Sequence, residues 1–378
     1  MSNINDYIVN YGNNDFNELP YNRIDDMILA RFSNLPFYKI SLEKKETIYS
    51  IFQKFKKLKS DEFLYKGDET LIYNLGDCHR FKNMLVSNYE YKVDNINEKQ
   101  FTAISIHINE TEIYISYGST DDSLTGWKED FNLGFMDKIP SQIDGTNYLK
   151  NLSNLYNKNI RLGGHSKGGN IAIVSACNVE KSIQNRMLSI SNYDGPGVTK
   201  YIADSESYQN ILNKIFTIIP QNSIIGRIFE HKENFSIIES IEKGIYQHDI
   251  YSWQISGTSI VALNSCTKFS ENFNEIFTDF LDKTNILERK IFVNALFTLI
   301  KSININSMSA FLQFKKINLI KMFKNNYIIE ETDRKIVNKL IFSFFKISIS
   351  IKMENLNIFS FNTLPLKFIK YSNLSKQN

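Results

Sequence analysis

The sequence of 378 residues predicts an α/β fold, in which a mostly parallel sheet carries helices on both faces and is followed by a helical C-terminal extension. Three observations predict it. Buried-strand patterns alternate with helical patterns over residues 1–265. A glycine-rich turn at 163–169 stands between a strand pattern and a helix pattern. Glycine is absent after Gly257, and residues 266–378 have the pattern of long apolar and basic helices, so we expect a second, smaller region there.

Each element of the core is predicted by its own pattern. In residues 101–117, Ile113 and Ile115 alternate with Tyr114 and Ser116, which indicates a hairpin with its turn at residues 109–110. The expected elements, in chain order, are helices at 18–34 and 41–58, the hairpin at 101–117, a helix near 145–157, and strands at 187–193, 215–219 and 234–240.

The composition indicates a folded protein of the reducing cytoplasm. A hydrophobic content of 42% and an aromatic content of 13% supply a large core and exclude a disordered chain. Cys78, Cys177 and Cys266 have no metal-ligand spacing and cannot all pair, so we expect reduced thiols, with Cys177 in the core. No secretory signal is visible in residues 1–6, and no apolar run is long enough to span a membrane.

The net charge of +3 is unevenly distributed along the chain. Residues 281–378 hold 16 Lys and Arg against 6 Asp and Glu, so the rest of the chain is acidic. A solvated lysine face on a helical extension explains this asymmetry, and it also permits peripheral contact with an anionic membrane. Liposome flotation tests that contact. This basic region is the only feature that would favour nucleic-acid binding, and we expect no nucleic-acid partner.

The glycine-rich turn is the most informative segment of the chain. Residues 163–169 read Gly-Gly-His-Ser-Lys-Gly-Gly and place Ser166 in the pattern Gly-x-Ser-x-Gly. This pattern is typical of a nucleophile elbow, a sharp strand-to-helix turn whose flanking residues must be small because strand and helix approach closely. Residues 159–162 fit the end of a buried strand, and Ala172 and Ala176 fit a helix close to a sheet. We expect Ser166 to be a nucleophile; the alternative is a glycine turn with an incidental serine.

A serine hydroxyl needs a base to take its proton, an acid to orient that base, and N–H donors for the developing oxyanion. In this kind of site the acid and then the histidine follow the serine in the chain. Only His231 and His248 follow Ser166. His248 comes after a strand pattern and a turn at Gly244, so we expect it to be the base, with His231 as the alternative. We expect His165, inside the elbow, to be structural.

The acid is assigned from its position at the end of a strand. Asp194 lies directly after the strand pattern of residues 187–193 and before a Gly-Pro-Gly turn, which suits the orienting role. The alternative is a turn aspartate that caps this loop. Asp249 is adjacent to His248, a geometry that rarely lets a carboxylate reach the imidazole, and Glu230 is a further candidate.

The oxyanion hole is expected to use two backbone N–H groups. One comes from the residue after the nucleophile, which is Lys167, and the other from an early strand-to-helix loop. Ser119 lies in such a loop, after the strand pattern of residues 111–117, although an ordinary polar turn would look the same.

Four segments together resemble a known family. Residues 117–131 resemble the Arg-Gly-Thr…Trp…Asp stretch of class 3 lipases, and residues 164–170 resemble their Gly-His-Ser-x-Gly-Gly elbow. With residues 192–197 and 247–249, the chain resembles the Mbeg-like family of bacterial α/β hydrolases, which is related to class 3 lipases. The resemblance covers about residues 15–260 and, more loosely, 266–378. The resemblance implies an α/β-hydrolase fold and a serine hydrolase, and it does not indicate a substrate.

The sequence departs from the class 3 pattern in three places. Those lipases carry the triad acid in an Asp-Pro-Val-Pro-like segment, whereas the matching residues 219–226 contain no carboxylate, which favours Asp194. Tyr117 stands where those lipases usually carry arginine. Lys167 is unusual after the nucleophile, and we hypothesise that its ammonium group holds an anionic headgroup or leaving group.

The predicted reaction is the hydrolysis of carboxylic esters, with lipid or acyl esters as the leading substrates. Ser166 attacks, His248 is base and then acid, Asp194 orients it, and the N–H groups of Lys167 and Ser119 stabilise the oxyanion. The sequence implies no metal or organic cofactor. The alternative from another class is a catalytically inactive hydrolase fold that serves as a binding or scaffold protein.

Overall fold

The computed structural model describes residues 2–313 and 315–350. Nine strands form one sheet in the order β1-β2-β3-β4-β5-β6-β7-β8-β11. The strands of this sheet are β1 (Lys45–Thr47), β2 (Leu85–Asp94), β3 (Lys99–His107), β4 (Glu112–Tyr117), β5 (Asn159–His165), β6 (Met187–Tyr193), β7 (Ile215–Pro220), β8 (Phe235–Ile238) and β11 (Ala262–Leu263). A separate short ribbon pairs β9 (Ile255–Ser256) with β10 (Ser259–Ile260).

The sheet has a parallel centre and antiparallel edges. Strands β4 to β8 pair in parallel, one after the other. Strands β1 to β4 pair antiparallel, as does β11 with β8. The α/β fold class is therefore confirmed, as is the hairpin predicted over residues 101–117. The carboxyl ends of the parallel strands meet at one edge, where sites of open α/β sheets form.

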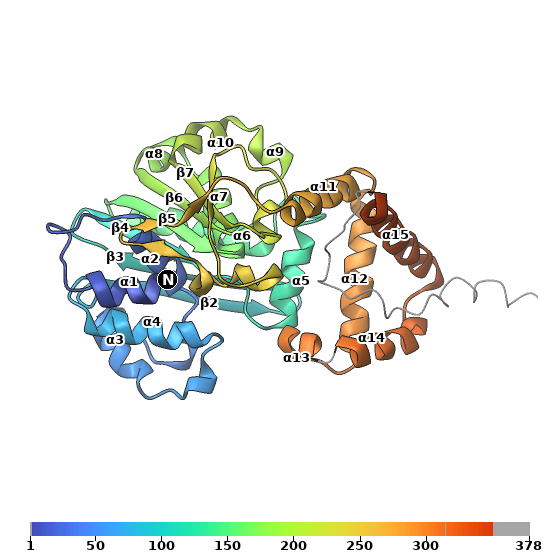
Figure 1. Cartoon of the computed structure of the whole chain (residues 1–378), viewed down its shortest axis with the longest axis horizontal. Helices are drawn as coiled ribbons and strands as arrows, with labels where there is room; N and C mark the ends of the chain where they lie inside the picture. Colours follow the sequence, from blue (N-terminus) through green and yellow to red (C-terminus); the bar gives the residue numbers. More distant parts are fainter. Residues whose placement is uncertain (1, 314, 351–378) are drawn as a thin grey trace, which may run out of the picture.

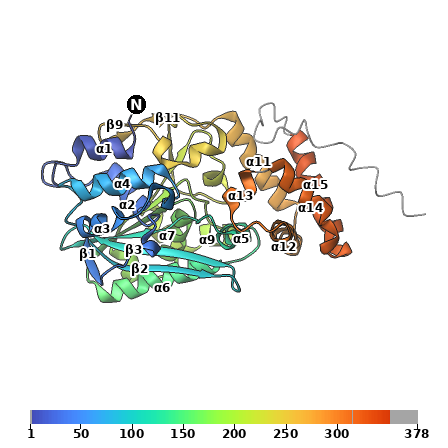
Figure 2. The same cartoon turned by 90° about the horizontal axis from the view of Figure 1, so that it is seen from below.

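Helices cover both faces of the sheet. One face carries α1 (Ile4–Tyr11), α2 (Arg23–Phe32), α3 (Ile48–Phe55) and α4 (Lys66–Asp77), and the opposite face carries α6 (Pro140–Leu155), which lies below the strands in Figure 2. The remaining helices of the core are α5 (Leu124–Asn132), α7 (Lys167–Cys177), α8 (Lys181–Asn185), α9 (Lys200–Ala203) and α10 (Glu206–Ile211).

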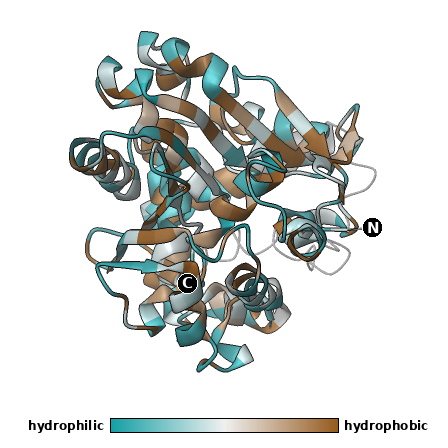
Figure 3. Cartoon of the chain, turned by 90° about the vertical axis from the view of Figure 1, so that its left-hand side faces the viewer, coloured by the Kyte–Doolittle hydropathy of each residue, from teal (hydrophilic) through white to brown (hydrophobic). Residues whose placement is uncertain are grey.

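Alternation along the strands supplies a separate core to each face. On β4, Tyr114 packs with the helices α1 to α4, whereas Ile113, Ile115 and Tyr117 pack with α6 and α7. Successive side chains of a strand point to opposite faces, so one strand contributes to both cores. In Figure 3 hydrophobic segments run along the strands and the packed helices, while peripheral loops are mostly hydrophilic.

Some predicted boundaries were wrong for local reasons. The helix expected over 41–58 is only α3, because residues 45–47 pair with β2 as strand β1 and Thr47 then caps the helix by accepting from Ser50 N. The helix expected over 18–34 begins at Arg23, because the Asn22 side chain caps it. Strand β2 was not predicted, because its polar sequence lacks a strand pattern.

The described part of the C-terminal region consists mainly of helices. It comprises α11 (Lys268–Asp282), α12 (Ile286–Ser302), α13 (Met308–Gln313), α14 (Lys315–Lys324) and α15 (Glu331–Ser350). Figure 1 shows these helices beside α5, at one end of the sheet. Phe297 of α12 packs on Phe131 of α5 with ring centroids 5.5 Å apart. The extension is predicted to reach residue 378, and residues 351–378 of it lie outside the described residues.

The extension leaves large apolar side chains exposed, including Leu287, Ile320 and Phe342. The predicted contact of this basic region with an anionic membrane stays a prediction. Within residues 2–313 and 315–350, no helix combines the length and the apolar character that crossing a bilayer requires.

Candidate active site

Ser166 occupies the turn between β5 and α7, as the elbow motif predicts. Its backbone has φ 56° and ψ −129°, a left-handed conformation that costs energy for any residue with a Cβ. The turn fits only because its neighbours are small: a Cβ at Gly168 would collide with the Tyr117 carbonyl oxygen of β4. The chain thus stores strain at the serine and orders strand, turn and helix as an elbow requires.

Asp194 follows β6 and is held from several directions. Its carboxylate is almost fully buried, at 1% exposure, and its Oδ1 accepts hydrogen bonds from Ser223 Oγ at 2.5 Å and Gly226 N at 3.2 Å. Both donors come from residues 219–226, a segment that contains no carboxylate of its own. In this chain that segment supports a carboxylate from the neighbouring strand instead of supplying one.

His248 pairs with the second oxygen of the same carboxylate. Its Nδ1 lies 2.6 Å from Asp194 Oδ2, and its side chain is 23% exposed. The ring lies in a loop of two short 3-10 turns, residues 244–248 and 250–252. Trp253 secures this loop by donating from its indole Nε1 to the Gln247 carbonyl oxygen at 2.7 Å. The carboxylate therefore orients the imidazole, and the His248 Nε2 makes no hydrogen bond with the residues that the structure describes.

The elbow and the His248–Asp194 pair lie against each other. The Ser166 N–H donates to the Tyr193 carbonyl oxygen, directly before Asp194, at 2.9 Å. A Cβ at Gly195 would collide with the Ser166 carbonyl oxygen. The ring of His165, directly before the serine, contacts the His248 ring with centroids 4.6 Å apart. The Ser166 hydroxyl makes no hydrogen bond with any residue that the structure describes.

The two expected oxyanion donors differ in availability. Lys167 is the first residue of α7, so its N–H has no acceptor within the helix. The Ser119 N–H lies in the loop after β4, but it donates to Asn34 Oδ1 at 2.7 Å. Ser119 Oγ turns to the elbow, where it donates to the His165 carbonyl oxygen at 3.0 Å. Ser119 is thus placed beside the elbow, with its N–H occupied by a side chain from the end of α2.

The hypothesis that the Lys167 ammonium group meets an anionic ligand is wrong in this structure. The side chain is 1% exposed, and its Nζ donates to Glu129 Oε2 at 3.1 Å and to Gln100 Oε1 at 2.7 Å. Asp130 lies nearby, with its pKa raised to about 6 by burial and lowered again only in part by Lys167. The ammonium group ties α7 to α5 and β3, and only the backbone N–H of Lys167 remains for the site.

His231, the alternative base, belongs to a different cluster. Its Nδ1 lies 2.8 Å from Glu233 Oε1, and Glu233 also accepts from Thr217 Oγ1 at 2.6 Å. The His231 side chain is 8% exposed, and its Nε2 is buried without a hydrogen-bond partner among the described residues. Glu230 is exposed, and Asp249 accepts from Tyr251 N within its own loop; the carboxylate that pairs with the His248 ring is that of Asp194.

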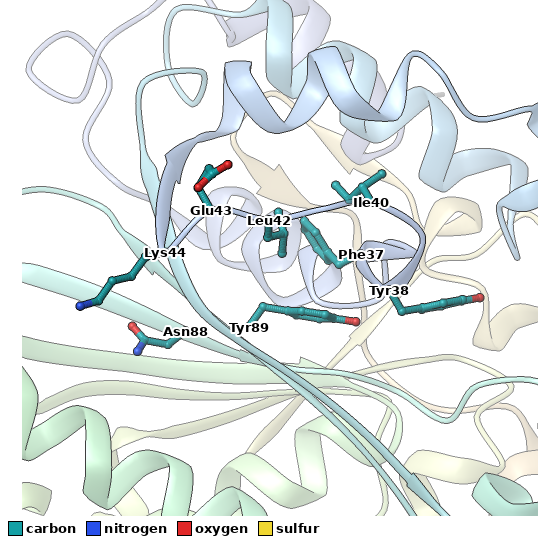
Figure 4. Close-up of a pocket in the computed structure, with 8 residues that line it drawn as sticks. All are labelled: Phe37, Tyr38, Ile40, Leu42, Glu43, Lys44, Asn88 and Tyr89. Atoms are coloured by element: carbon teal, nitrogen blue, oxygen red, sulfur yellow. The ribbon is translucent and has the colours of Figure 1, made fainter.

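An open pocket of about 420 Å³ lies away from these residues, between a loop before β1 and the irregular part of β2. Figure 4 shows aromatic and aliphatic side chains converging on it. Its lining residues are Phe37, Tyr38, Ile40, Leu42, Glu43, Lys44, Asn88 and Tyr89. None of them is a predicted site residue. Among the described residues, no three His, Cys, Asp or Glu side chains are grouped as a metal site requires.

The sheet, the elbow after β5 and the His248–Asp194 pair, whose aspartate follows the adjacent strand β6, define a protein of the α/β-hydrolase fold class. A family model described as Mbeg1-like matches residues 75–298, which is more than half of the chain. The chain belongs to the Mbeg1-like family. Among solved structures, the lipase from Rhizopus microsporus var. chinensis is similar at 14% identity and a TM-score of 0.34, over 62% of this chain and 86% of that chain. No curated protein matches the sequence.

Proposed function

We propose that this protein is a serine hydrolase that cleaves carboxylic esters through an acyl-enzyme. One observation carries the proposal: a buried Asp194 holds His248 Nδ1 at 2.6 Å, beside a strained elbow that presents Ser166. Backbone strain at the serine and an imidazole oriented by a buried carboxylate are features of an activated serine nucleophile, and we propose that the Ser166 hydroxyl comes within reach of His248 Nε2 when substrate binds. A structural turn would gain nothing from a serine held in a left-handed conformation.

The first half of the proposed reaction forms the acyl-enzyme. His248 Nε2 takes the proton of the Ser166 hydroxyl as Oγ bonds to the ester carbonyl carbon. The carbonyl π electrons move onto oxygen, and Asp194 stabilises the imidazolium. As the oxyanion collapses, the bond from the carbonyl carbon to the alcohol oxygen breaks. His248 gives its proton to that oxygen and the alcohol leaves. The acyl group stays bonded to Ser166 Oγ.

The second half uses water in the place of the alcohol. His248 takes a proton from water, the hydroxide oxygen bonds to the acyl carbon, and the ester bond to Ser166 breaks. His248 then returns a proton to Ser166 Oγ, which restores the free enzyme and releases the carboxylic acid. In this proposal the N–H of Lys167, the first residue of α7, stabilises the oxyanion in both halves. The Ser119 N–H becomes available for the same role once a substrate oxygen displaces the Asn34 amide.

The substrate class that we propose is an acyl ester with an apolar chain. The helical extension contacts both loops that support the site: Ser309 N donates to Asp122 Oδ1 at 2.8 Å, and Ser270 Oγ donates to the Ser223 carbonyl oxygen at 2.6 Å. An extension with exposed apolar side chains, tied to these loops, favours a lipid-like substrate over a polar one.

Labelling with a fluorophosphonate probe tests the proposal. We expect the wild-type chain to be labelled on Ser166, and Ser166→Ala to lose both the label and at least about 10³-fold of its turnover on nitrophenyl esters. Ser175→Ala is a matched control, because Ser175 is a buried serine of the same helix α7, and it should keep the label.

A panel of esters with graded chain length then defines the substrate. Turnover that rises with acyl length supports the apolar substrate class. A folded wild-type chain that takes no label between pH 6 and 9 would contradict the proposed hydrolase and favour a binding protein on the same fold.

A further inference from the structure

His165 joins three parts of the candidate site through one buried side chain. The residue ends β5 directly before Ser166, and it is only 3% exposed. Its Nε2 lies 2.8 Å from the His248 carbonyl oxygen, and its Nδ1 lies 3.2 Å from Ser119 Oγ. The elbow, the loop of the base and the oxyanion loop therefore meet at a single imidazole.

The contacts fix which nitrogen of His165 carries the proton. A backbone carbonyl oxygen can only accept, so Nε2 must be the N–H donor to His248. In the neutral ring Nδ1 is then an acceptor, and the one Ser119 hydroxyl proton can be donated either to it, at 3.2 Å, or to the His165 carbonyl oxygen, at 3.0 Å. Burial, and then the neighbouring His248, hold the pKa of His165 well below its usual range, which agrees with a neutral ring.

The same imidazole also packs on the side of the His248 ring. The ring centroids are 4.6 Å apart with planes 34° apart, and Trp253 lies beyond His165 with centroids 6.2 Å apart. His248 is therefore held at two points: Asp194 binds its Nδ1, and His165 binds its main-chain oxygen and covers one face of its ring. Trp253 secures the loop at the Gln247 carbonyl oxygen, and His165 adds a bond at the main chain of His248 itself.

We infer that His165 is a positioning residue that fixes the main chain of His248 in register with Ser166 and the oxyanion loop. The inference rests on the proposed function, since it concerns the base of that reaction. Its physical basis is geometric: the serine and its base come from segments separated by about eighty residues, and a misplacement of about 1 Å can cost on the order of 10²-fold in rate. His165 connects the two segments directly, because it is covalently next to one and hydrogen-bonded to the other.

Three variants at this position separate the hydrogen bond from the packing. His165→Gln retains a side-chain N–H donor and an oxygen acceptor, whereas His165→Phe and His165→Met retain volume and lack both. We expect kcat to fall about 10- to 100-fold in the Phe and Met variants, with KM within about 3-fold of wild type. We expect the Gln variant to recover about 10-fold relative to Met. Because Gln and Met are similar in length and volume, their comparison carries the test even if the Phe variant does not fold.

His107→Phe is the matched control for loss of a buried histidine. His107 is 5% exposed on β3 and bonds to Ser87, away from the elbow, so its replacement should leave kcat within about 3-fold of wild type. Equal losses of kcat in His165→Gln and His165→Met, or no loss in either, would overturn the inference, because the hydrogen bond would then contribute nothing.

Proton NMR of the His248 Nδ1–H separates this inference from the proposed function, because it needs no turnover. We expect the resonance of this strongly hydrogen-bonded proton to be sharp in wild type and in His165→Gln, and broadened or shifted in His165→Met. If the resonance changes in His165→Met as expected but the wild-type chain takes no fluorophosphonate label, the proposed hydrolase is refuted and the positioning role of His165 is supported. A labelled wild-type chain whose resonance is the same in all variants would refute the positioning role alone.

Discussion

Two histidine–carboxylate pairs lie in the part of the chain that the structure describes, and they differ in their surroundings. In both, Nδ1 lies close to a carboxylate oxygen, at 2.6 Å for His248–Asp194 and 2.8 Å for His231–Glu233. The His248 side chain is 23% exposed beside the elbow, whereas that of His231 is 8% exposed and its Nε2 faces no partner among the described residues. A carboxylate-bound imidazole is therefore not sufficient evidence for a base; its second nitrogen must also reach a reacting group and solvent.

Matched replacement of the two histidines gives the largest expected difference between the pairs. His248→Gln should lower kcat by at least about 10³-fold, because the base is lost. His231→Gln should leave kcat within about 3-fold and lower the free energy of unfolding by about 1–3 kcal/mol, because Glu233 loses a buried partner. Ester turnover and urea unfolding measure the two effects. A large loss of kcat in His231→Gln with normal stability would reverse the assignment of the base.

Removing the hydroxyl group that donates to each carboxylate should produce a smaller difference in kcat between the two pairs. Ser223 Oγ donates to Asp194, and Thr217 Oγ1 donates to Glu233. Ser223→Ala should lower kcat by about 10-fold, because a hydrogen bond to a charged group is worth about 1.5–3 kcal/mol and Gly226 N still supports the carboxylate. Thr217→Val should reduce the melting temperature without changing kcat. If both variants affect only the melting temperature, the support of Asp194 has no part in the reaction.

The features that could be predicted from the sequence are local ones. The strand, glycine turn and helix around Ser166 follow from small residues at fixed positions within a few residues of the serine. Asp194 was identified because a strand pattern ends there. In these segments the backbone conformation depends on consecutive residues. Periodicity and turn composition were therefore enough to place Ser166 and Asp194 at the carboxyl ends of adjacent strands.

The features that could not be predicted depend on distant segments. Ser223 supports an acid that lies 29 residues earlier, and His165 bonds to a carbonyl oxygen 83 residues later. Lys167 looked like an exposed cation, but Glu129, 38 residues earlier, buries and pairs it. No local pattern signals such contacts. Residues 219–226 contain a serine but lack the expected carboxylate, and this is the one sequence signal that could have indicated that Ser223 supports the acid.

A further expected difference concerns the pH dependence of stability, and it belongs to the buried pair His231–Glu233. Burial alone would raise the pKa of Glu233, but the hydrogen bond and charge of His231, with hydroxyl donors, lower it to about 2. Because this pKa lies below the ordinary value of about 4.3, Glu233 stabilises the fold above that value, and the stabilisation is lost as the pH falls through 4.3 toward about 2. Wild type should therefore exceed Glu233→Gln in free energy of unfolding by up to about 3 kcal/mol at pH 7, and this gap should narrow steadily as the pH falls from about 4 toward about 2. Urea unfolding between pH 7 and 2.5 measures the gap. A gap that stays constant over this range would mean that the carboxylate contributes packing rather than charge, and the contrast with the His248 pair would then depend on exposure alone.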